Sequence, residues 1–144
     1  MEWYKRILIP TDGSNNSRRA IEHGLELAKL LNSDVTAVSV IDVSDLASRT
    51  QVFTPTPLAS TQADVTDAAV AEVAMLAKGM GVRATTQVRM GSPALDIIEM
   101  SQKYDLIVMG TKGRTGLPHL LMGSVAEKVV REAKCPVLVV KATD

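Results

Sequence analysis

The chain has 144 residues, of which 46% are hydrophobic and 22% charged, a composition that suits one packed domain and excludes a disordered chain. Its 16 Lys and Arg residues balance its 16 Asp and Glu residues, which excludes an overall basic surface for nucleic acid or anionic membranes. The single cysteine, Cys135, excludes an internal disulfide and a multi-cysteine metal site. We therefore expect one domain over residues 1–144, in the cytoplasm, with neither nucleic acid nor membrane as partner.

Short β-branched runs alternate with longer segments of helical periodicity, which is typical of a parallel sheet with crossover helices. The first half of the chain predicts a strand over 5–10, a helix over 16–32, a strand over 34–41 and a helix over 63–79. The polar connection over roughly 42–62 contains Pro55 and Pro57 and is predicted as a surface loop.

Residues 82–90 alternate between apolar and polar side chains, so one face of this strand contacts water and we expect it at an edge of the sheet. Ser92 and Pro93 have the residue types of an N-cap and a first helical position, and predict a helix to about Lys103. A strand over 105–109, a glycine-rich loop over 110–123, a helix from Ser124 to about Lys134 and a strand over 136–140 complete an α/β pattern.

Ligands of open parallel sheets bind beyond the carboxyl ends of the strands, where the strand order reverses. The segments Pro10–Gly13 and Val40–Asp42 and the glycine-rich loop follow predicted strands and meet this condition. Asp12 has the chemistry to accept a ribose hydroxyl or to hold a metal through water. Its structural alternative is to cap the helix over 16–32, or the turn before that helix.

The glycine-rich loop is the most informative segment of the chain. Glycines recur every third residue after the strand, at Gly110, Gly113 and Gly116, and Gly123 and Ser124 then open a helix. Glycines permit close backbone approach, and the first N–H groups of a helix lack partners within the helix, so the segment has the features of an anion cradle. Lys112 and Arg114 add local positive charge, and Met109 at the strand exit is a candidate pocket floor.

Each of these features also has a structural explanation. Ser124 and Glu127 have the spacing of a capping box, and loop glycines often serve only turns. The combination of spaced glycines, two cations and a helix N-terminus in one connection favours phosphate binding. The phosphate-loop motif of kinases and GTPases and the dinucleotide fingerprint are both absent from the sequence.

These residues carry a family resemblance. Gly110-x-x-Gly113, nine further residues and Gly123-Ser124 resemble the motif of the ATP-binding branch of the universal stress protein family. The opening segment Ile7–Ser14 and the closing segment Cys135–Val140 are similar to that family as well, so the resemblance covers essentially the whole chain.

The resemblance implies a Rossmann-like, three-layer fold of the adenine nucleotide alpha hydrolase-like type. Its five-stranded parallel sheet has the order 3-2-1-4-5, with helices on both faces. It also implies ATP as ligand, with Mg or Mn bound mainly through the phosphates, and a homodimer through the strand over 136–140. The nucleotide-binding residues that it implies are Pro10, Thr11, Asp12, Val40, Met109, Gly110, Thr111, Gly113, Arg114, Gly123, Ser124 and Val125.

The expected function is that of a nucleotide-dependent regulator or switch in the stress response, whose output passes through an unidentified protein partner. The chain offers a phosphate cradle but no general base or nucleophile that the sequence can assign, so no catalytic residue is predicted. One alternative is a slow ATPase or adenylyl-transfer enzyme in which Asp12 positions metal and water. The other is a structural dimer module whose loop binds nothing.

Overall fold

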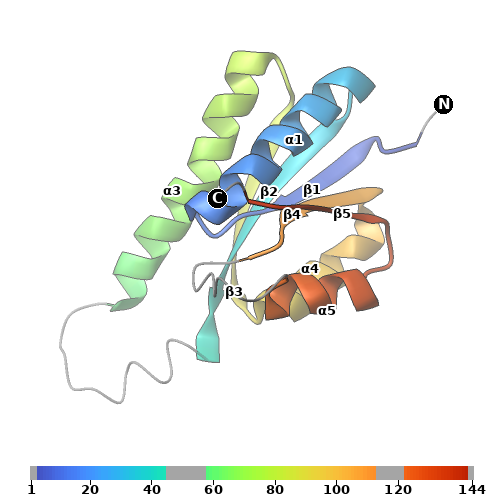
Figure 1. The fold of residues 1–144 in the computed structure, drawn as a ribbon. Helices are drawn as coiled ribbons and strands as arrows, with labels where there is room; N and C mark the ends of the chain where they lie inside the picture. Colours follow the sequence, from blue (N-terminus) through green and yellow to red (C-terminus); the bar gives the residue numbers. More distant parts are fainter. Residues whose placement is uncertain (1–2, 45–57, 113–121, 143–144) are drawn as a thin grey trace.

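Five parallel strands form one sheet in the order β3-β2-β1-β4-β5 (Figure 1). The computed structural model describes residues 3–44, 58–112 and 122–142. The sheet confirms the expected α/β fold, its strand order and the edge position of the strand predicted over 82–90. The strands are β1 (Arg6–Pro10), β2 (Asp34–Asp42), β3 (Ala84–Gly91), β4 (Leu106–Gly110) and β5 (Val137–Val140).

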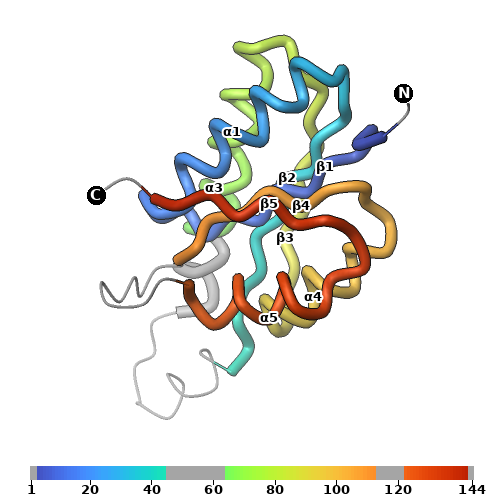
Figure 2. Tube along the Cα trace, turned by 45° about the vertical axis from the view of Figure 1, so that its right-hand side comes forward, coloured from blue at the N-terminus to red at the C-terminus, as the bar shows by residue number. Residues whose placement is uncertain are grey.

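Helices cover both faces of the sheet, which makes three layers (Figures 1 and 2). α1 (Asn15–Leu31) and α3 (Leu58–Met80) pack on one face. α4 (Pro93–Met100), the 3-10 turn η1 (Ser101–Lys103) and α5 (Ser124–Glu132) pack on the other. None of the helices among the described residues has the length and apolarity to cross a membrane.

The core is aliphatic on both faces of the sheet. Along β1, Ile7 and Ile9 pack toward α1 and α3, while Leu8 packs toward α4 and α5, as the two-residue period of a strand requires. Gly24 brings α1 close to the sheet, because a Cβ at this position would lie 2.6 Å from Ile9 Cδ1. The central strands are therefore closely packed between the two layers of helices.

The edge strand β3 is more open than its sequence predicts. Its polar side chains contact water as expected, but Val88 is 39% exposed and Met90 is 63% exposed on the face toward α3. Only β2 flanks β3, and the register pairs Val35–Asp42 with Ala84–Gly91. The alternating pattern therefore identified the edge position but not the exposure of both faces.

The ends of several elements differ from the prediction. α3 begins at Leu58, whereas the sequence places residues 58–62 in the loop over 42–62. The stretch after Pro57 contains the helix formers Leu58 and Ala59, and proline is well tolerated just before or at a helix start. The helix predicted to reach Lys103 ends at Met100 and continues as η1.

Candidate functional site

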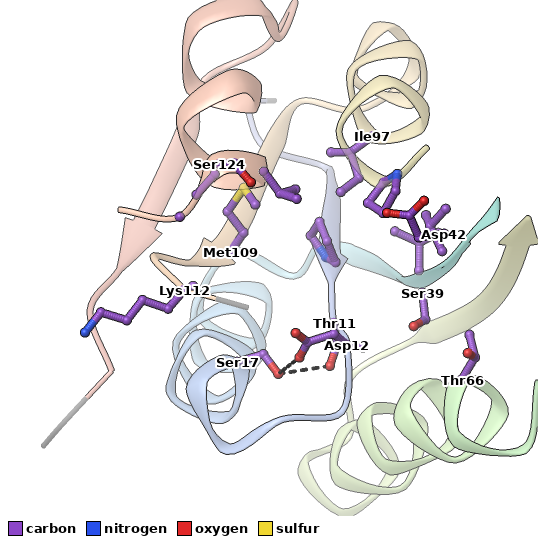
Figure 3. A pocket seen from close by; sticks show the side chains of 18 of the residues that line it. Thr11, Asp12, Ser17, Ser39, Asp42, Thr66, Ile97, Met109, Lys112 and Ser124 are labelled. Carbon is purple, nitrogen blue, oxygen red and sulfur yellow. Dashed lines mark hydrogen bonds between the residues drawn. The ribbon is translucent and has the colours of Figure 1, made fainter. Parts of the chain in front are cut away.

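A cavity of about 300 Å³ lies at the carboxyl ends of β1, β2 and β4, where the strand order reverses (Figure 3). The helices α1, α3, α4 and α5 contribute to its walls. This is the position at which open parallel sheets bind ligands. Its lining residues are Pro10, Thr11, Asp12, Ser17, Val38, Ser39, Val40, Ile41, Asp42, Thr66, Pro93, Ile97, Met109, Gly110, Thr111, Lys112, Gly123, Ser124, Val125 and Ala126.

The structure brings together all the sequence-predicted site residues that it describes. Gly113 and Arg114, together with Gly116, lie outside the described residues. The sequence did not assign Ser17, Ser39, Thr66 or Ile97 to the site, although all four line the cavity. Thr66 on α3 and Ile97 on α4 reach the cavity because those helices pack on the sheet, and no local sequence motif predicts that packing.

β1 and β2 separate at the edge of the cavity. Their register ends at Pro10 and Val38, and Thr11 N donates a hydrogen bond of 2.9 Å to Val38 O. β2 continues to Asp42 without β1 beside it. Backbone groups of residues two apart point to the same side of a strand, so the N–H and C=O of Val40 face the space that β1 has left. A planar ligand edge with one donor and one acceptor fits these groups.

Asp12 is held by a tight turn directly after β1. Its Oδ1 accepts hydrogen bonds from Ser14 N at 2.9 Å and from Ser14 Oγ at 2.6 Å. Gly13 has a φ of +81°, and a Cβ there would lie 3.2 Å from Ala69 Cβ of α3. The N-cap of α1 is Ser14, so Asp12 caps the turn before the helix rather than the helix itself. Its carboxylate also lines the cavity.

Two further hydroxyls support this turn. Ser17, in the first turn of α1, donates to Ser14 O at 2.9 Å and lies 3.1 Å from Thr11 Oγ1. Thr11 Oγ1 accepts a bond from Gly13 N at 3.2 Å, and a long contact of 3.5 Å joins Ser17 to Asp12 (Figure 3). The loop from β1 to α1 is therefore fixed before any ligand arrives.

The N-terminus of α5 faces the opposite side of the cavity. Gly123 is the N-cap, with no side-chain cap, and its carbonyl accepts the bond from Glu127 N at 3.0 Å. This corrects the capping-box prediction: Ser124 is the first helical residue, because the glycine before it occupies the cap. The N–H groups of the first turn at Ser124, Val125 and Ala126 border the cavity, and such groups lack partners within a helix.

Two backbone hydrogen bonds attach this helix start to the sheet. Gly123 N donates to Thr111 O at 2.6 Å, and Thr111 N donates to Val140 O of β5 at 3.2 Å. A Cβ at Gly110 would lie 2.9 Å from Asn16 O of α1. The glycine at position 110 is therefore required by close packing against α1, whatever else it contributes to the cavity.

The charges in the cavity are divided between its ends. The positive end of the α5 dipole borders the cavity, and Lys112, just after β4, borders it too, with its amino group directed away from the other labelled side chains (Figure 3). Asp12 and Asp42 lie at the ends of β1 and β2. Among the described residues no three His, Cys, Asp or Glu side chains come together as a metal site. The arrangement suits a ligand with an anionic end toward α5 and an uncharged polar end toward β2.

Two histidines and one cysteine are the other side chains with possible catalytic chemistry. His23 is exposed on α1 and is not among the residues that line the cavity, and His119 is outside the described residues. Cys135, which precedes β5, is half-buried and packs against the core between the sheet and α4 and α5. Burial, and then the charge of Asp105, raise the pKa of its thiol. This cysteine has the character of a packing residue.

The family model described as the universal stress protein family matches residues 4–141. Universal stress protein MJ0531 of Methanocaldococcus jannaschii is 41% identical over 140 residues, which cover 96% of this chain and 82% of that protein. The solved structure of protein MJ0577, from the same organism, is 28% identical, with a TM-score of 0.85 and 99% of each chain covered.

Two more distant solved structures share the fold. A universal stress protein in complex with cAMP is 23% identical, with a TM-score of 0.69, and the match covers 99% of this chain and 100% of that one. The universal stress protein of Archaeoglobus fulgidus in complex with dAMP is 20% identical, with a TM-score of 0.66, and the match covers 94% of this chain and 97% of that one.

Proposed function

The chain belongs to the universal stress protein family, and on this premise we propose that it binds ATP in the cavity at the carboxyl ends of its strands and acts as a nucleotide-dependent regulator. The observation that carries this proposal is the pairing of an uncapped helix start at Gly123 with open backbone groups at Val40, across one cavity. Family members bound to cAMP and dAMP, as described above, support an adenine nucleotide as the ligand class.

The end of the cavity at β2 suits the base. Adenine presents a donor and an acceptor on one edge, which match the C=O and N–H of Val40. The apolar side chains of Ile97 and Met109, which are almost fully buried, offer aliphatic surfaces for the ring. No aromatic side chain is among the described residues that line the cavity, which agrees with a chain of 3% aromatic residues.

The end at α5 suits the phosphates. The first-turn N–H groups of α5 and the helix dipole favour an anion, and Lys112 adds a positive side chain nearby. Gly113 and Arg114 belong to this end by the family motif. Mg or Mn would arrive with the phosphates, and Asp12 is the carboxylate best placed to hold such an ion through water. The metal would neutralise phosphate charge.

Regulation is favoured over catalysis because the described residues that line the cavity include no histidine or cysteine and only two carboxylates, Asp12 and Asp42. Asp12 already accepts two short hydrogen bonds in its turn. Slow ATP hydrolysis or adenylyl transfer is the second candidate function, with Asp12 orienting a metal-bound water. Turnover of Mg-ATP above the blank would support this second function if Asp12→Ala abolishes the turnover and retains ATP binding.

Calorimetric titration with Mg-ATP tests the main proposal. We expect binding with a raised melting temperature of the protein, and weaker binding of GTP. An absence of both heat and melting shift at millimolar ATP would contradict nucleotide binding, and would leave the structural dimer module as the better reading. Mass spectrometry of the purified protein identifies any adenylate that accompanies it.

The partners proposed with this function are ATP, a second copy of the chain and a protein that receives the signal. β5 is a short edge strand with Leu138 38% exposed, and a second β5 would cover its unpaired backbone groups. We place the protein in the cytoplasm, where ATP is available and a lone thiol stays reduced.

A further inference from the structure

Two of the buried polar side chains of this fold differ from the rest. Thr11, Ser17, Ser33, Thr36 and Ser101 all have side-chain hydrogen bonds, and Thr66 has an interaction as well. Within the described residues, the hydroxyls of Ser39 and Thr111 have no hydrogen-bond partner, although the two residues are only 4% and 6% exposed.

Both hydroxyls border the nucleotide cavity. Among the described residues, every side-chain oxygen or nitrogen that is sealed from solvent has a hydrogen-bond partner. The oxygens of Ser39 and Thr111 have no such partner, so they are not sealed and remain open to the cavity. Water in the cavity can satisfy both oxygens until a ligand displaces it, and a ligand that leaves them unpaired loses affinity. A ligand that fits this cavity is therefore expected to form hydrogen bonds with these hydroxyls.

The two hydroxyls lie at different parts of the cavity. Thr111 adjoins Gly123 at the end proposed for the phosphates. Ser39 projects from β2 toward α3, where Thr66 faces the same space (Figure 3). The carboxylate of Asp42, which lies on the same strand as Ser39 and also lines the cavity, disfavours a phosphate there. This end of the cavity suits an uncharged polar group.

We infer that Ser39 is a specificity-determining residue that recognises the base, its Oγ accepting a hydrogen bond from the exocyclic 6-amino group of adenine. The inference rests on the proposed nucleotide site. With the phosphates at α5, the part of a purine that reaches β2 and α3 is the six-membered ring, on the side remote from the sugar. Val40, the next residue along β2, offers its backbone groups to that same edge, so the two residues together distinguish adenine from guanine.

The test combines stability and affinity. Ser39→Ala is expected to leave the ligand-free protein about as stable as the wild type, since its hydroxyl makes no hydrogen bond to the described residues. It is also expected to weaken ATP binding about tenfold. Thr36→Val is the matched control on the same strand: its hydroxyl bonds Thr85 Oγ1 at 3.2 Å, away from the cavity. This control should lower stability and leave ATP affinity unchanged.

Nucleotide analogues identify the atom. Purine riboside triphosphate lacks the 6-amino group, whereas 7-deaza-ATP keeps it. Ser39→Ala should weaken ATP and 7-deaza-ATP alike and leave purine riboside triphosphate unaffected. Unchanged ATP affinity, or an equal loss for all three nucleotides, overturns the role of Ser39 while nucleotide binding stands. Failure of the wild type to bind any of the three overturns the nucleotide site itself, and this inference with it.

Discussion

Ser14 donates two hydrogen bonds to one oxygen of Asp12, from its backbone N at 2.9 Å and from its Oγ at 2.6 Å. The serine is the N-cap of α1, yet its hydroxyl makes no cap bond within the helix. The helix start and the cavity carboxylate are therefore linked through a single side chain. A change at Ser14 is expected to affect both stability and ligand binding.

Ser14→Ala should lower the free energy of unfolding by about 1 kcal/mol, because the buried side of the turn loses a charge-assisted hydrogen bond. ATP affinity should fall less than in Asp12→Ala. Urea unfolding and calorimetry measure the two effects. Ser44 makes the same pair of bonds to Asp42 on an exposed turn, so Ser44→Ala is the matched control and should change stability less. Equal losses for the two serines would contradict a special role of the Asp12 turn.

Gly123→Val should abolish ATP binding and leave the protein folded. The backbone of Gly123 has a φ of −73°, which any residue adopts, so the substitution introduces no backbone strain. A side chain there would block the approach of phosphates to the start of α5. Circular dichroism and calorimetry check the two halves of this prediction. Gly79→Val, at an exposed site with no atom within 4 Å of the added Cβ, is the control. Retained affinity in Gly123→Val would count against the phosphate site.

By the family motif we expect Gly113→Val, too, to abolish ATP binding and leave the protein folded.

Gly110→Ala should destabilise the fold, since its Cβ would lie 2.9 Å from the backbone oxygen of Asn16. Overpacking of this kind costs about 1–3 kcal/mol. Gly79→Ala, in the last turn of α3, should raise stability by about 0.5–1 kcal/mol through helix propensity. Chemical denaturation of both variants tests the contrast. An unchanged midpoint for Gly110→Ala would mean that α1 shifts to accommodate the methyl group.

Val139→Lys should convert the proposed dimer to a monomer, because a charge on β5 opposes pairing of two copies of this edge. Sedimentation velocity measures the change. Thr86→Lys places the same charge on the opposite edge strand, β3, and should leave the dimer intact. A dimer that survives Val139→Lys would place the interface elsewhere.

Cys135 should react slowly with alkylating reagents near neutral pH. Burial, and then the negative charge of Asp105, raise the pKa of its thiol, so the reactive thiolate is scarce. The raised pKa also makes stability fall as the pH rises past the ordinary thiol value, since the unfolded chain releases this proton first. Asp105→Asn should speed alkylation modestly. Alkylation as fast as that of a free cysteine would contradict the burial of this side chain.

The sequence predicted the parts of the site that lie on strand ends. Pro10, Val40 and Gly110 follow from the positions of strands in a parallel sheet, because carboxyl ends converge on one edge. Ser39, Thr66 and Ile97 could not be assigned in this way. Ser39 lies on β2 beside Val40, but the strand pattern does not tell which side chains enter the cavity. Thr66 and Ile97 reach the cavity through the packing of α3 and α4 on the sheet, which local patterns do not contain.

The capping box shows a second limit of local patterns. Ser124 and Glu127 have the correct spacing, yet Gly123 occupies the cap. The bond from Gly123 N to Thr111 O fixes the glycine at the helix start through a long connection in the chain. The local sequence favours Ser124 as the cap, so a contact between segments outside the helix accompanies the start that the structure adopts.

The hydrogen bonds at Thr111 have a practical consequence for protein engineering. They join both ends of the connection between β4 and α5 to the sheet, independently of what lies between them. Lengthening a closed connection costs little, about 0.6 kcal/mol for each doubling of its length. A fluorescent reporter domain inserted into this connection is therefore expected to leave the sheet and α5 assembled, with the reporter beside the cavity at the carboxyl ends of the strands.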